Sequence, residues 1–473
     1  MGGFMYKIIM TVVSLMAFSG FIYAQEKDSA SKEENTQTAS VDENLTNLKG
    51  KVDGLEESYL ETKSTVASLS KIKVSGYIQS QYQVADVKNV LSAMYSVPSN
   101  KVAASVYGRQ AFLIKRGRVK TTYDAGLSQY VLELDATQDG VGLKDAYASF
   151  SEPWLKTFKL TMGSMDRPFG YEVGYSSSAL ESPERSRMIG NLFPKEKDLG
   201  AMIEVDPQVE ALDWFNFKGG VYNGMTNITD EDDDYKDMIG RAGFKAPFRE
   251  LGLSIDGGAS GYFGKVTDFD TTTGTNGRAF YMDGTSWKVT NNQKGKTFDR
   301  KYFGVDMQLY YATPVIGGTC IKGEYIQGHH PTKGGASDFY GSGASVTAAD
   351  PIYQRLIDGY YVYFIQNIDA ANCQLVVKYD MWDPNTKVKA SDFSDATTTL
   401  TNQDLAISTL GFGGIMYLPW SNNVRLQLYY EIPKYEKLDA GKVTSANKSL
   451  YKYTKYASNN NLNMLTFRIQ YKF

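Results

Sequence analysis

The chain has 473 residues, a formal net charge of −3 and an apolar fraction of 42%, so its bulk charge points to no nucleic acid or other polyionic partner. Beyond Ala24 no stretch is long and apolar enough to span a bilayer as a helix, which argues against a helical membrane protein. Transmembrane β-strands are not excluded, because about half of their residues are polar. The 44 glycines and 34 tyrosines suit many strands, turns and aromatic rings at a membrane surface.

The segment 1–24 has the pattern of an export signal. Lys7 is followed by a mostly apolar run that ends at Ala24, and we expect cleavage after that residue. The run is nearly as long as the shortest membrane helices, so an uncleaved anchor is the alternative. Residues 25–40 are polar, and we expect them to form a disordered spacer.

Residues 41–70 are expected to form a periplasmic coiled coil, because apolar residues recur there at alternating intervals of four and three, the spacing of a heptad seam. Gly50 and Gly54 weaken the helix by roughly 1 kcal/mol each, so its stability should come from association. A single amphipathic helix packed on another part of the protein is the alternative. The residues of the seam are Val41, Leu45, Leu48, Val52, Leu55, Tyr59, Thr62, Val66 and Leu69.

Residues 71–473 divide into roughly sixteen strand-like segments separated by Gly, Asn, Asp and Pro turns. An even number is what a closed barrel with both ends on one side of the membrane needs. The segments are 72–84, 109–122, 127–138, 142–151, 157–165, 199–206, 211–224, 238–247, 251–264, 299–312, 317–328, 357–367, 371–382, 403–418, 423–434 and 462–473.

The last segment shows the two-faced pattern most clearly. Leu465, Phe467 and Ile469 share one face, and Thr466 and Arg468 share the other. Such a strand faces lipid on one side and a water-filled lumen on the other, and an aromatic last residue is typical of Gram-negative outer-membrane barrels. A half-buried strand of an ordinary β domain is the alternative. The sequence therefore predicts an all-β fold, an antiparallel transmembrane β-barrel of about 16 strands with an N-terminal helical coiled coil.

The connections between the segments predict the orientation of the barrel. Short turns alternate along most of the chain with long connections such as 265–298 and 383–402, the exception being the tight link at 139–141. Outer-membrane barrels have short periplasmic turns and long exterior loops. We therefore expect the long connections to face the exterior and the N-terminus to face the periplasm.

The connection from Asp166 to Asp198 differs from the others. It contains Asp-Arg-Pro-Phe-Gly-Tyr-Glu at 166–172, three serines at 176–178, Glu-Arg at 184–185, Leu-Phe-Pro at 192–194 and a closing Asp-Leu-Gly at 198–200. Through these motifs, and through Lys-Arg-Gly-Arg at 115–118, the chain resembles the phosphate-selective porin O and P family. The resemblance extends over about 72–473, although only the loop motifs are specific and the rest is barrel patterning.

That resemblance implies a trimeric porin whose third loop folds into the lumen and narrows it. Rings of Arg or Lys are how pores favour anions, because a guanidinium keeps its charge and offers forked donors to phosphate or carboxylate. The resemblance places three residues at or near the constriction, namely Arg167, Arg185 and Arg187. It places four on the pore wall, namely Lys115, Arg116, Arg118 and Lys120.

Two features depart from the family pattern. Where the family has Arg before the closing Asp, this chain has Lys197 with Glu196 beside it. On the second segment the basic residues share parity with Phe112 and Ile114, so they can face the lumen only if a bulge shifts the register. The loop arginines have two alternative roles, contact with lipopolysaccharide phosphates near the rim or pairing with the loop carboxylates Glu172, Glu181 and Glu184.

The sequence contains no nucleophile elbow, phosphate-binding Gly loop or metalloprotease pair, so we expect neither enzyme activity nor a cofactor. His329 and His330 are adjacent without further ligands, and the acidic run at 231–234 lacks the spacing of a calcium loop. Cys320 and Cys373 fall on strands with opposite facing, which argues against a disulfide.

We therefore expect passive diffusion of small hydrophilic solutes through a homotrimeric porin in the outer membrane of a Gram-negative bacterium. Anions, with phosphate as one candidate, would be favoured, and the other partners would be membrane lipid and lipopolysaccharide. An adhesin or envelope anchor with a plugged barrel is the main alternative. A barrel enzyme that draws on one of the two histidines is another.

Overall fold

The structure is a computed structural model that describes residues 37–85, 110–138, 140–225, 234–268, 270, 274–333, 351–393, 400, 404–437 and 463–473. It divides into two compact units, Met1–Ser70 and Lys71–Phe473. The expected export signal at 1–24 and most of the expected spacer lie outside the described residues.

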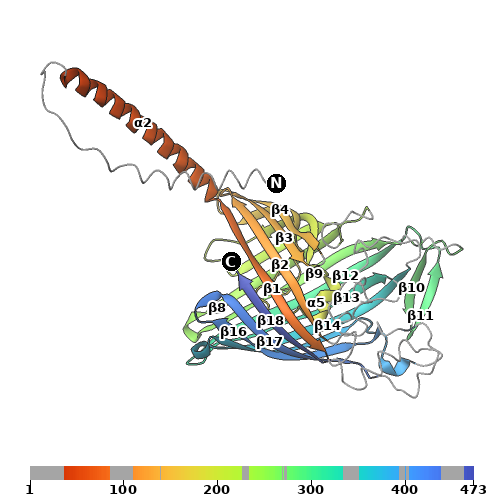
Figure 1. Ribbon diagram of the computed structural model, residues 1–473. Helices are drawn as coiled ribbons and strands as arrows, with labels where there is room; N and C mark the ends of the chain where they lie inside the picture. The colour runs from red at the N-terminus through yellow and green to blue at the C-terminus, as the bar shows by residue number, and fades with distance from the viewer. Residues whose placement is uncertain are drawn as a thin grey trace. The chain divides into compact units, whose positions relative to one another are not determined.

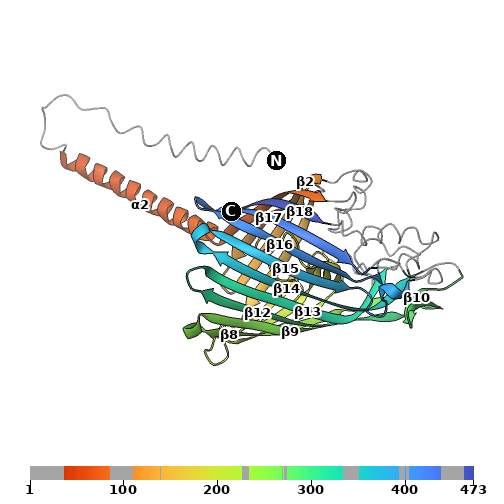
Figure 2. The ribbon, with the colours of Figure 1, turned by 90° about the horizontal axis from the view of Figure 1, so that it is seen from below.

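Strand pairing closes the second unit into an antiparallel barrel (Figure 1, Figure 2). Successive barrel strands pair along the chain, β9 pairs with β12, and β18 pairs with β1 to complete a ring of 16 strands. Each strand of the ring overlaps one of the segments expected from the sequence. The strands are β1 (Ile72–Ala85), β2 (Gln110–Asp124), β3 (Ser128–Thr137), β4 (Gly140–Ser151), β5 (Phe158–Asp166), β6 (Lys197–Val205), β7 (Phe215–Tyr222), β8 (Asp237–Phe248), β9 (Leu253–Thr267), β12 (Thr297–Thr313), β13 (Gly317–Lys333), β14 (Ile352–Ile368), β15 (Cys373–Asp383), β16 (Ile407–Leu418), β17 (Ser421–Tyr435) and β18 (Met464–Lys472).

The wall of the barrel has the inverse polarity of a soluble protein. On β18 the apolar residues Leu465, Phe467 and Ile469 are exposed on the outer face, whereas Thr466 and Arg468 are buried inside. A spanning barrel needs an apolar outer band because that face contacts lipid, and the pairing of strands around the ring satisfies the backbone groups that lipid cannot. The predicted antiparallel barrel of 16 strands is therefore confirmed.

Short turns and long connections lie at opposite ends of the barrel, as predicted. The antiparallel order places turns such as 249–252 at one end and connections such as 268–296 at the other. Within 268–296 the structure adds a hairpin that the sequence did not predict, β10 (Arg278–Asp283) and β11 (Ser286–Asn291), and β10 pairs in parallel with β14. Trp287 of this hairpin packs with Val388 and Phe393 of the connection 384–406.

The described part of the first unit is the helix α2 (Gln37–Leu69). It begins at Gln37, so residues 37–40 of the expected spacer are helical instead. Along the predicted heptad seam, Leu48, Val52, Leu55 and Tyr59 are each more than half exposed. Among the described residues, no helix combines the length and the hydropathy needed to cross a membrane.

A bulge in β2 decides which way its basic side chains face. Ile114 pairs with Ser80 and Arg116 pairs with the neighbouring Gln79, which leaves Lys115 as the extra residue. Phe112 and Ile114 consequently lie on the outer face, while Arg116 is buried inside. In a flat strand Phe112, Ile114 and Arg116 would share one face. The bulge shifts the register between Ile114 and Arg116, so the two apolar residues face outward and the arginine faces inward.

Deleting Lys115 should remove this bulge without turning either part of β2 over, because Ile114 and Arg116 then become neighbours that already face opposite sides. We expect this variant to keep the folded, heat-modifiable band on unboiled gels. Deleting Gly117 should instead turn either Arg116 or Arg118 to the lipid face, where a basic side chain costs about 2–4 kcal/mol, so that variant should lose the band. Loss of the band after deletion of Lys115, or its persistence after deletion of Gly117, would contradict the role of the bulge.

Candidate pore constriction

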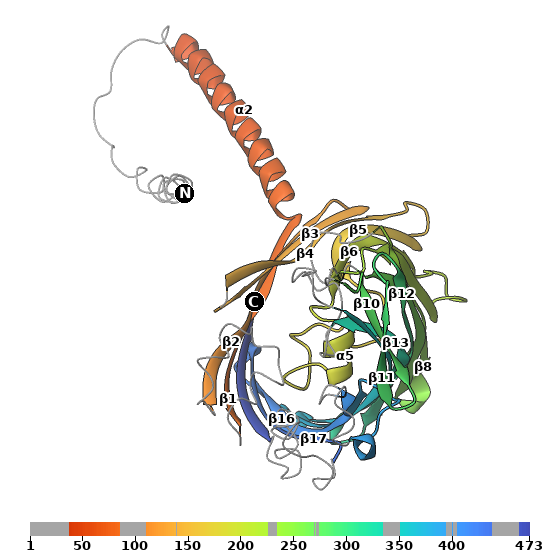
Figure 3. The same cartoon turned by 90° about the vertical axis from the view of Figure 1, so that its right-hand side faces the viewer.

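Residues 167–196, called the lumen loop below, join β5 to β6 and fold into the barrel (Figure 3). Phe169 is buried, and its ring centroid lies 5.0 Å from that of Phe193 in the same loop and 6.4 Å from that of Tyr302 on β12. Gly170 has a φ of 58°, and a side chain there would collide with the carboxylate of Glu324. The Phe-Gly pair therefore serves to insert the loop: the ring fills an aromatic cluster and the glycine permits the close approach.

The lumen loop is a folded element with its own internal bonds. The backbone N–H and the hydroxyl of Ser186 both donate to Glu172 Oε2 at 2.8 Å. Ser186 also caps the short helix α5 (Arg187–Leu192) by accepting from the N–H of Ile189. Met188, Ile189 and Leu192 of this helix are buried, so the helix is packed into the interior of the barrel.

Polar side chains of the wall donate to backbone carbonyls of the loop. Gln79 of β1 donates to the carbonyl of Ser177 at 3.0 Å, and Gln470 of β18 and Arg425 of β17 donate to that of Ser178 at 3.0 and 3.1 Å. All three donors are less than 5% exposed. A buried donor without a partner costs about 1–3 kcal/mol, so the wall and the loop depend on each other.

The first limb of the loop is bound from another direction. Ser260 of β9 accepts from the N–H of Gly170 at 2.9 Å. Glu324 of β13 accepts from the N–H groups of Tyr171 and Glu172 at 3.3 and 3.2 Å. Together with the donors on β1, β17 and β18, these contacts attach the loop to separate parts of the wall.

Glu184 attaches the loop to two strands of the wall by ion pairs. Its carboxylate pairs with Arg116 at 2.8 Å and Lys115 at 3.6 Å on β2, and with Arg468 at 2.9 Å on β18. Burial alone would raise the pKa of Glu184, but the three cations hold that pKa well below its ordinary value. Lys115, the residue of the β2 bulge, thus contributes to loop attachment.

Arg185, expected at the constriction, uses its guanidinium within the loop. It donates to the carbonyls of Glu172 and Tyr175 at 2.9 and 2.6 Å, to the Ser177 hydroxyl at 3.1 Å and to Glu196 Oε1 at 2.5 Å. Four donations of this kind tie both limbs of the loop together. Arg185 thus fastens the loop, but the carboxylate that it contacts is Glu196, which was not among the three expected partners.

The other two expected constriction residues also contact protein groups. Arg167 is 1% exposed, donates to the carbonyl of Pro194 at 3.2 Å and lies 5.0 Å from the ring centroid of Phe193. Arg187 donates to the Thr409 hydroxyl of β16 at 2.8 Å. All three arginines lie inside the barrel, on the loop that crosses it.

The remaining expected wall residues lie on β2 beyond the bulge. Arg118 donates to Asp135 at 3.1 Å and pairs with Glu133 at 3.4 Å. Lys120 lies 3.8 Å from Asp145, and its side chain is 35% exposed. Among the expected wall residues, Lys120 is thus the one most open to a solute.

A second bulge delivers a further lysine to the loop. On β4 Lys144 is the extra residue between the pairs formed by Leu143 and Asp145, and it pairs with Glu196 at 2.6 Å. Burial would raise the pKa of Glu196, but Arg185 and Lys144 hold it well below its ordinary value. The acid that departs from the family pattern is therefore fully paired.

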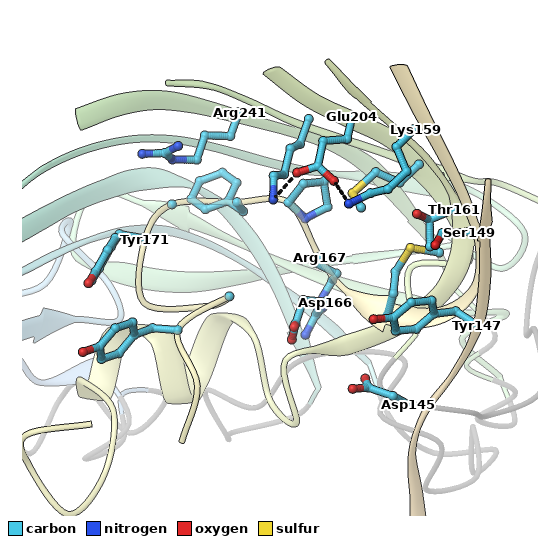
Figure 4. A pocket seen from close by; sticks show the side chains of 18 of the residues that line it. Asp145, Tyr147, Ser149, Lys159, Thr161, Asp166, Arg167, Tyr171, Glu204 and Arg241 are labelled. Atoms are coloured by element: carbon cyan, nitrogen blue, oxygen red, sulfur yellow. Dashed lines mark ion pairs between the residues drawn. The ribbon is translucent and has the colours of Figure 1, made fainter. Parts of the chain in front are cut away.

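One open part of the lumen beside the loop, called the open pocket below, has a volume of about 420 Å³ (Figure 4). Its wall includes Lys120, Lys159, Lys218 and Arg241, which come from β2, β5, β7 and β8, and its loop side includes Tyr171. Lys159, Lys218 and Arg241 were not among the site residues expected from the sequence. Each of them occupies a position of a predicted strand that alternation assigns to the polar, lumen-facing side, and that pattern could have identified them.

Charges of opposite sign are separated around the wall. Direct strand pairing places Lys159, Glu204, Lys218 and Arg241 in one row across β5 to β8. A neighbouring row across β12 to β15 consists of Asp306, Glu324, Tyr361 and Asp380. The first row faces the pocket, with Lys159 and Lys218 more than 40% exposed. In the second row Glu324 and Asp380 are each 3% exposed.

The structure shows no arrangement suited to a metal ion among the residues it describes. His330 lies inside the barrel with its Nδ1 2.7 Å from the Tyr302 hydroxyl. Cys320 and Cys373 are both free thiols. The described part of the acidic run at 231–234 is Asp234 alone, so that expectation lies almost wholly outside the described residues.

Comparison with known proteins returns distant structural neighbours. No family model matches the chain, and no curated protein matches it in sequence. Among solved structures the chain is similar to OmpF of Salmonella typhi in a complex with daunomycin, at 10% identity and a TM-score of 0.47 over 85% of this chain and 97% of that one. It is similar to the channel DcaP of Acinetobacter baumannii at 10% identity and a TM-score of 0.46, over 85% and 97%. It is also similar to the anion-selective porin from Comamonas acidovorans at 13% identity and a TM-score of 0.45, over 85% and 99%.

Because identity and TM-score are low in each case, we draw the functional inference from the side chains of this chain alone. The resemblance to the phosphate-selective porin O and P family remains a resemblance.

Glu184→Gln should loosen the lumen loop, because it leaves Arg116, Lys115 and Arg468 without their carboxylate, and losing one partner of a buried ion pair costs about 3–5 kcal/mol. We expect higher single-channel conductance with more current noise. A carboxylate whose pKa is lower in the folded state stabilises the fold at pH values above its unfolded pKa of about 4.3. This stabilisation is lost only as the pH falls through the pKa of the folded state. Wild-type attachment should therefore persist from pH 7 to below pH 4. Loosening of the wild-type loop near pH 5 would contradict this assignment.

Proposed function

We propose that this barrel is a passive diffusion channel of the outer membrane that favours small anions. The observation that carries the proposal is the separation of charge around the wall. The lysines of β5 and β7 line the open pocket, whereas the carboxylates of β13 and β15 are buried. The pocket also contains Asp145 and Asp166, and both of these carboxylates pair with Lys197, at 2.6 and 2.9 Å. A solute that crosses the lumen would meet the basic row first.

The basic row keeps an excess of positive charge after its internal ion pairs are counted. Glu204 pairs with Lys218 at 2.8 Å and also with Lys159, so one carboxylate is shared by two ammonium groups. Arg241 is neutralised by Asp306 at 2.6 Å. The open pocket therefore offers mobile, hydrated ammonium groups, which attract anions without holding them as a rigid guanidinium cluster does.

The loop arginines enter this proposal as positioning residues. Arg167, Arg185 and Arg187 each contact backbone or side-chain groups of the protein, so we infer that they set the width of the constriction. Phosphate is one anion that such a wall would pass. A preference for phosphate over other small anions would need a denser set of free donors than the open pocket presents.

Exchanging the sign of the basic row tests the proposal. In a bilayer with a salt gradient we expect the wild-type reversal potential to show anion preference. The double variant Lys159→Glu with Lys218→Glu should shift the reversal potential toward that of cations. The shift should correspond to a several-fold rise in the cation-to-anion permeability ratio, since each close charge contact is worth about 1 kcal/mol in water. Lys301→Glu, on β12 with its pair Asp299, is the matched control. Cation preference in the wild type, or no shift in the double variant, would refute the proposal.

We also propose that α2 associates with the helices of other copies as a parallel coiled coil, most simply in a homotrimer with its N-terminus in the periplasm. The support is the exposed seam of Leu48, Val52, Leu55 and Tyr59 on a helix that contains Gly50. An isolated helix with such a seam leaves apolar surface in water, and association would bury it.

Leu55→Glu should weaken that association, because it puts a charge into the buried seam. We expect the oligomer to dissociate at a lower temperature on unboiled gels and by native mass spectrometry. Leu60→Glu is the matched control, since Leu60 is also more than half exposed on the helix but lies off the seam. The same effect from both variants, or a monomeric wild type, would rule out the coiled coil.

A further inference from the structure

The open pocket has two chemically different sides, and only one of them is explained by the attraction of anions. Arg241 and Lys159 lie along one side, and Tyr171 of the lumen loop lies on another (Figure 4). Tyr175 lines the pocket as well. A small hydrated ion gains nothing from an aromatic wall, whereas a ring-bearing solute does.

The two tyrosines form a fixed surface. Their rings are stacked, with centroids 5.1 Å apart and an interplanar angle of 29°. Tyr175 donates its hydroxyl to Glu181 at 3.0 Å, and the ammonium of Lys322 lies 4.1 Å from its ring centroid. The N–H of Tyr171 is bound by Glu324. A surface anchored in this way loses little freedom when a second ring packs against it.

The basic side is suited to a carboxylate. Lys218 shares Glu204 with a second lysine and is 43% exposed, so it can exchange this partner for a carboxylate of the solute at small cost. Arg241 is held by Asp306 through two bonds, at 2.8 and 2.6 Å. It supplies a fixed donor group at the same pocket.

We propose that the pore favours aromatic carboxylates over aliphatic carboxylates of the same charge. The carboxylate is drawn to Lys218 and its neighbours, while the ring passes along Tyr171 and Tyr175. This inference rests on the proposed function, because it assigns a solute class to the same open pocket. The pocket volume of about 420 Å³ leaves room for a single ring with its hydration.

The test compares benzoate with acetate in a planar bilayer. With sodium benzoate on one side and sodium acetate on the other, the reversal potential should show a higher permeability for benzoate, although benzoate is larger and diffuses more slowly in water. Tyr171→Leu should abolish this preference, and Tyr171→Phe should keep it because the ring remains. Tyr130→Leu is the control, since Tyr130 lies on the outer face of β3 and is 51% exposed.

The outcomes separate this inference from the proposed function. Higher permeability for acetate in the wild type, or benzoate preference that survives Tyr171→Leu, overturns the inference. The proposed function still stands in that case if the channel prefers chloride over sodium. If Tyr171→Leu fails to fold, the wild-type ratio together with Tyr175→Phe still decides. Loss of the Tyr175 hydroxyl bond to Glu181 should release the ring pair and lower the benzoate-to-acetate ratio, and an unchanged ratio would count against the inference.

Discussion

The structure depends on one constraint, that a wall facing lipid must turn its polar side chains inward. Under the lumen loop those side chains are too buried for water to satisfy them. Gln79, Arg425 and Gln470 find their acceptors in carbonyls of the loop. The insertion of the loop is therefore part of how the barrel wall is stabilised, and the loop is not an appendage that narrows an otherwise complete pore.

The position of the loop follows from where the wall offers charge. Glu184 is drawn to the cations of β2 and β18, and the first limb is bound by Glu324 on β13. The loop covers the buried carboxylates of β13 and β15 and leaves the lysines of β5 and β7 open. Selectivity in this account arises from which half of the wall is covered, since the wall as a whole carries charges of both signs.

Much of the barrel could be predicted from the sequence, because apolar residues that face lipid alternate along each strand with polar residues that face the lumen. The bulge at Lys115 was also implied, since Phe112 and Arg116 share a parity that one flat strand cannot satisfy. The loop contacts could not be predicted, because pairs such as Arg468 and Glu184 are joined only by closure of the ring. Lys159 and Lys218 were overlooked for a related reason. A lysine on a lumen face is ordinary, and its importance depends on where the loop lies. The β10–β11 hairpin was missed inside a connection rich in Gly, Thr and Asp.

The most direct test is the accessibility of the two sectors to a water-soluble, charged thiol reagent. In a background in which Cys320 and Cys373 are replaced by Ser, Lys218→Cys places a thiol in the open pocket, and Thr409→Cys places one beside Arg187 under the loop. We predict rapid modification with a stepwise change of current for Lys218→Cys, and little modification for Thr409→Cys in the folded channel. Rapid modification of Thr409→Cys together with protection of Lys218→Cys would contradict the account.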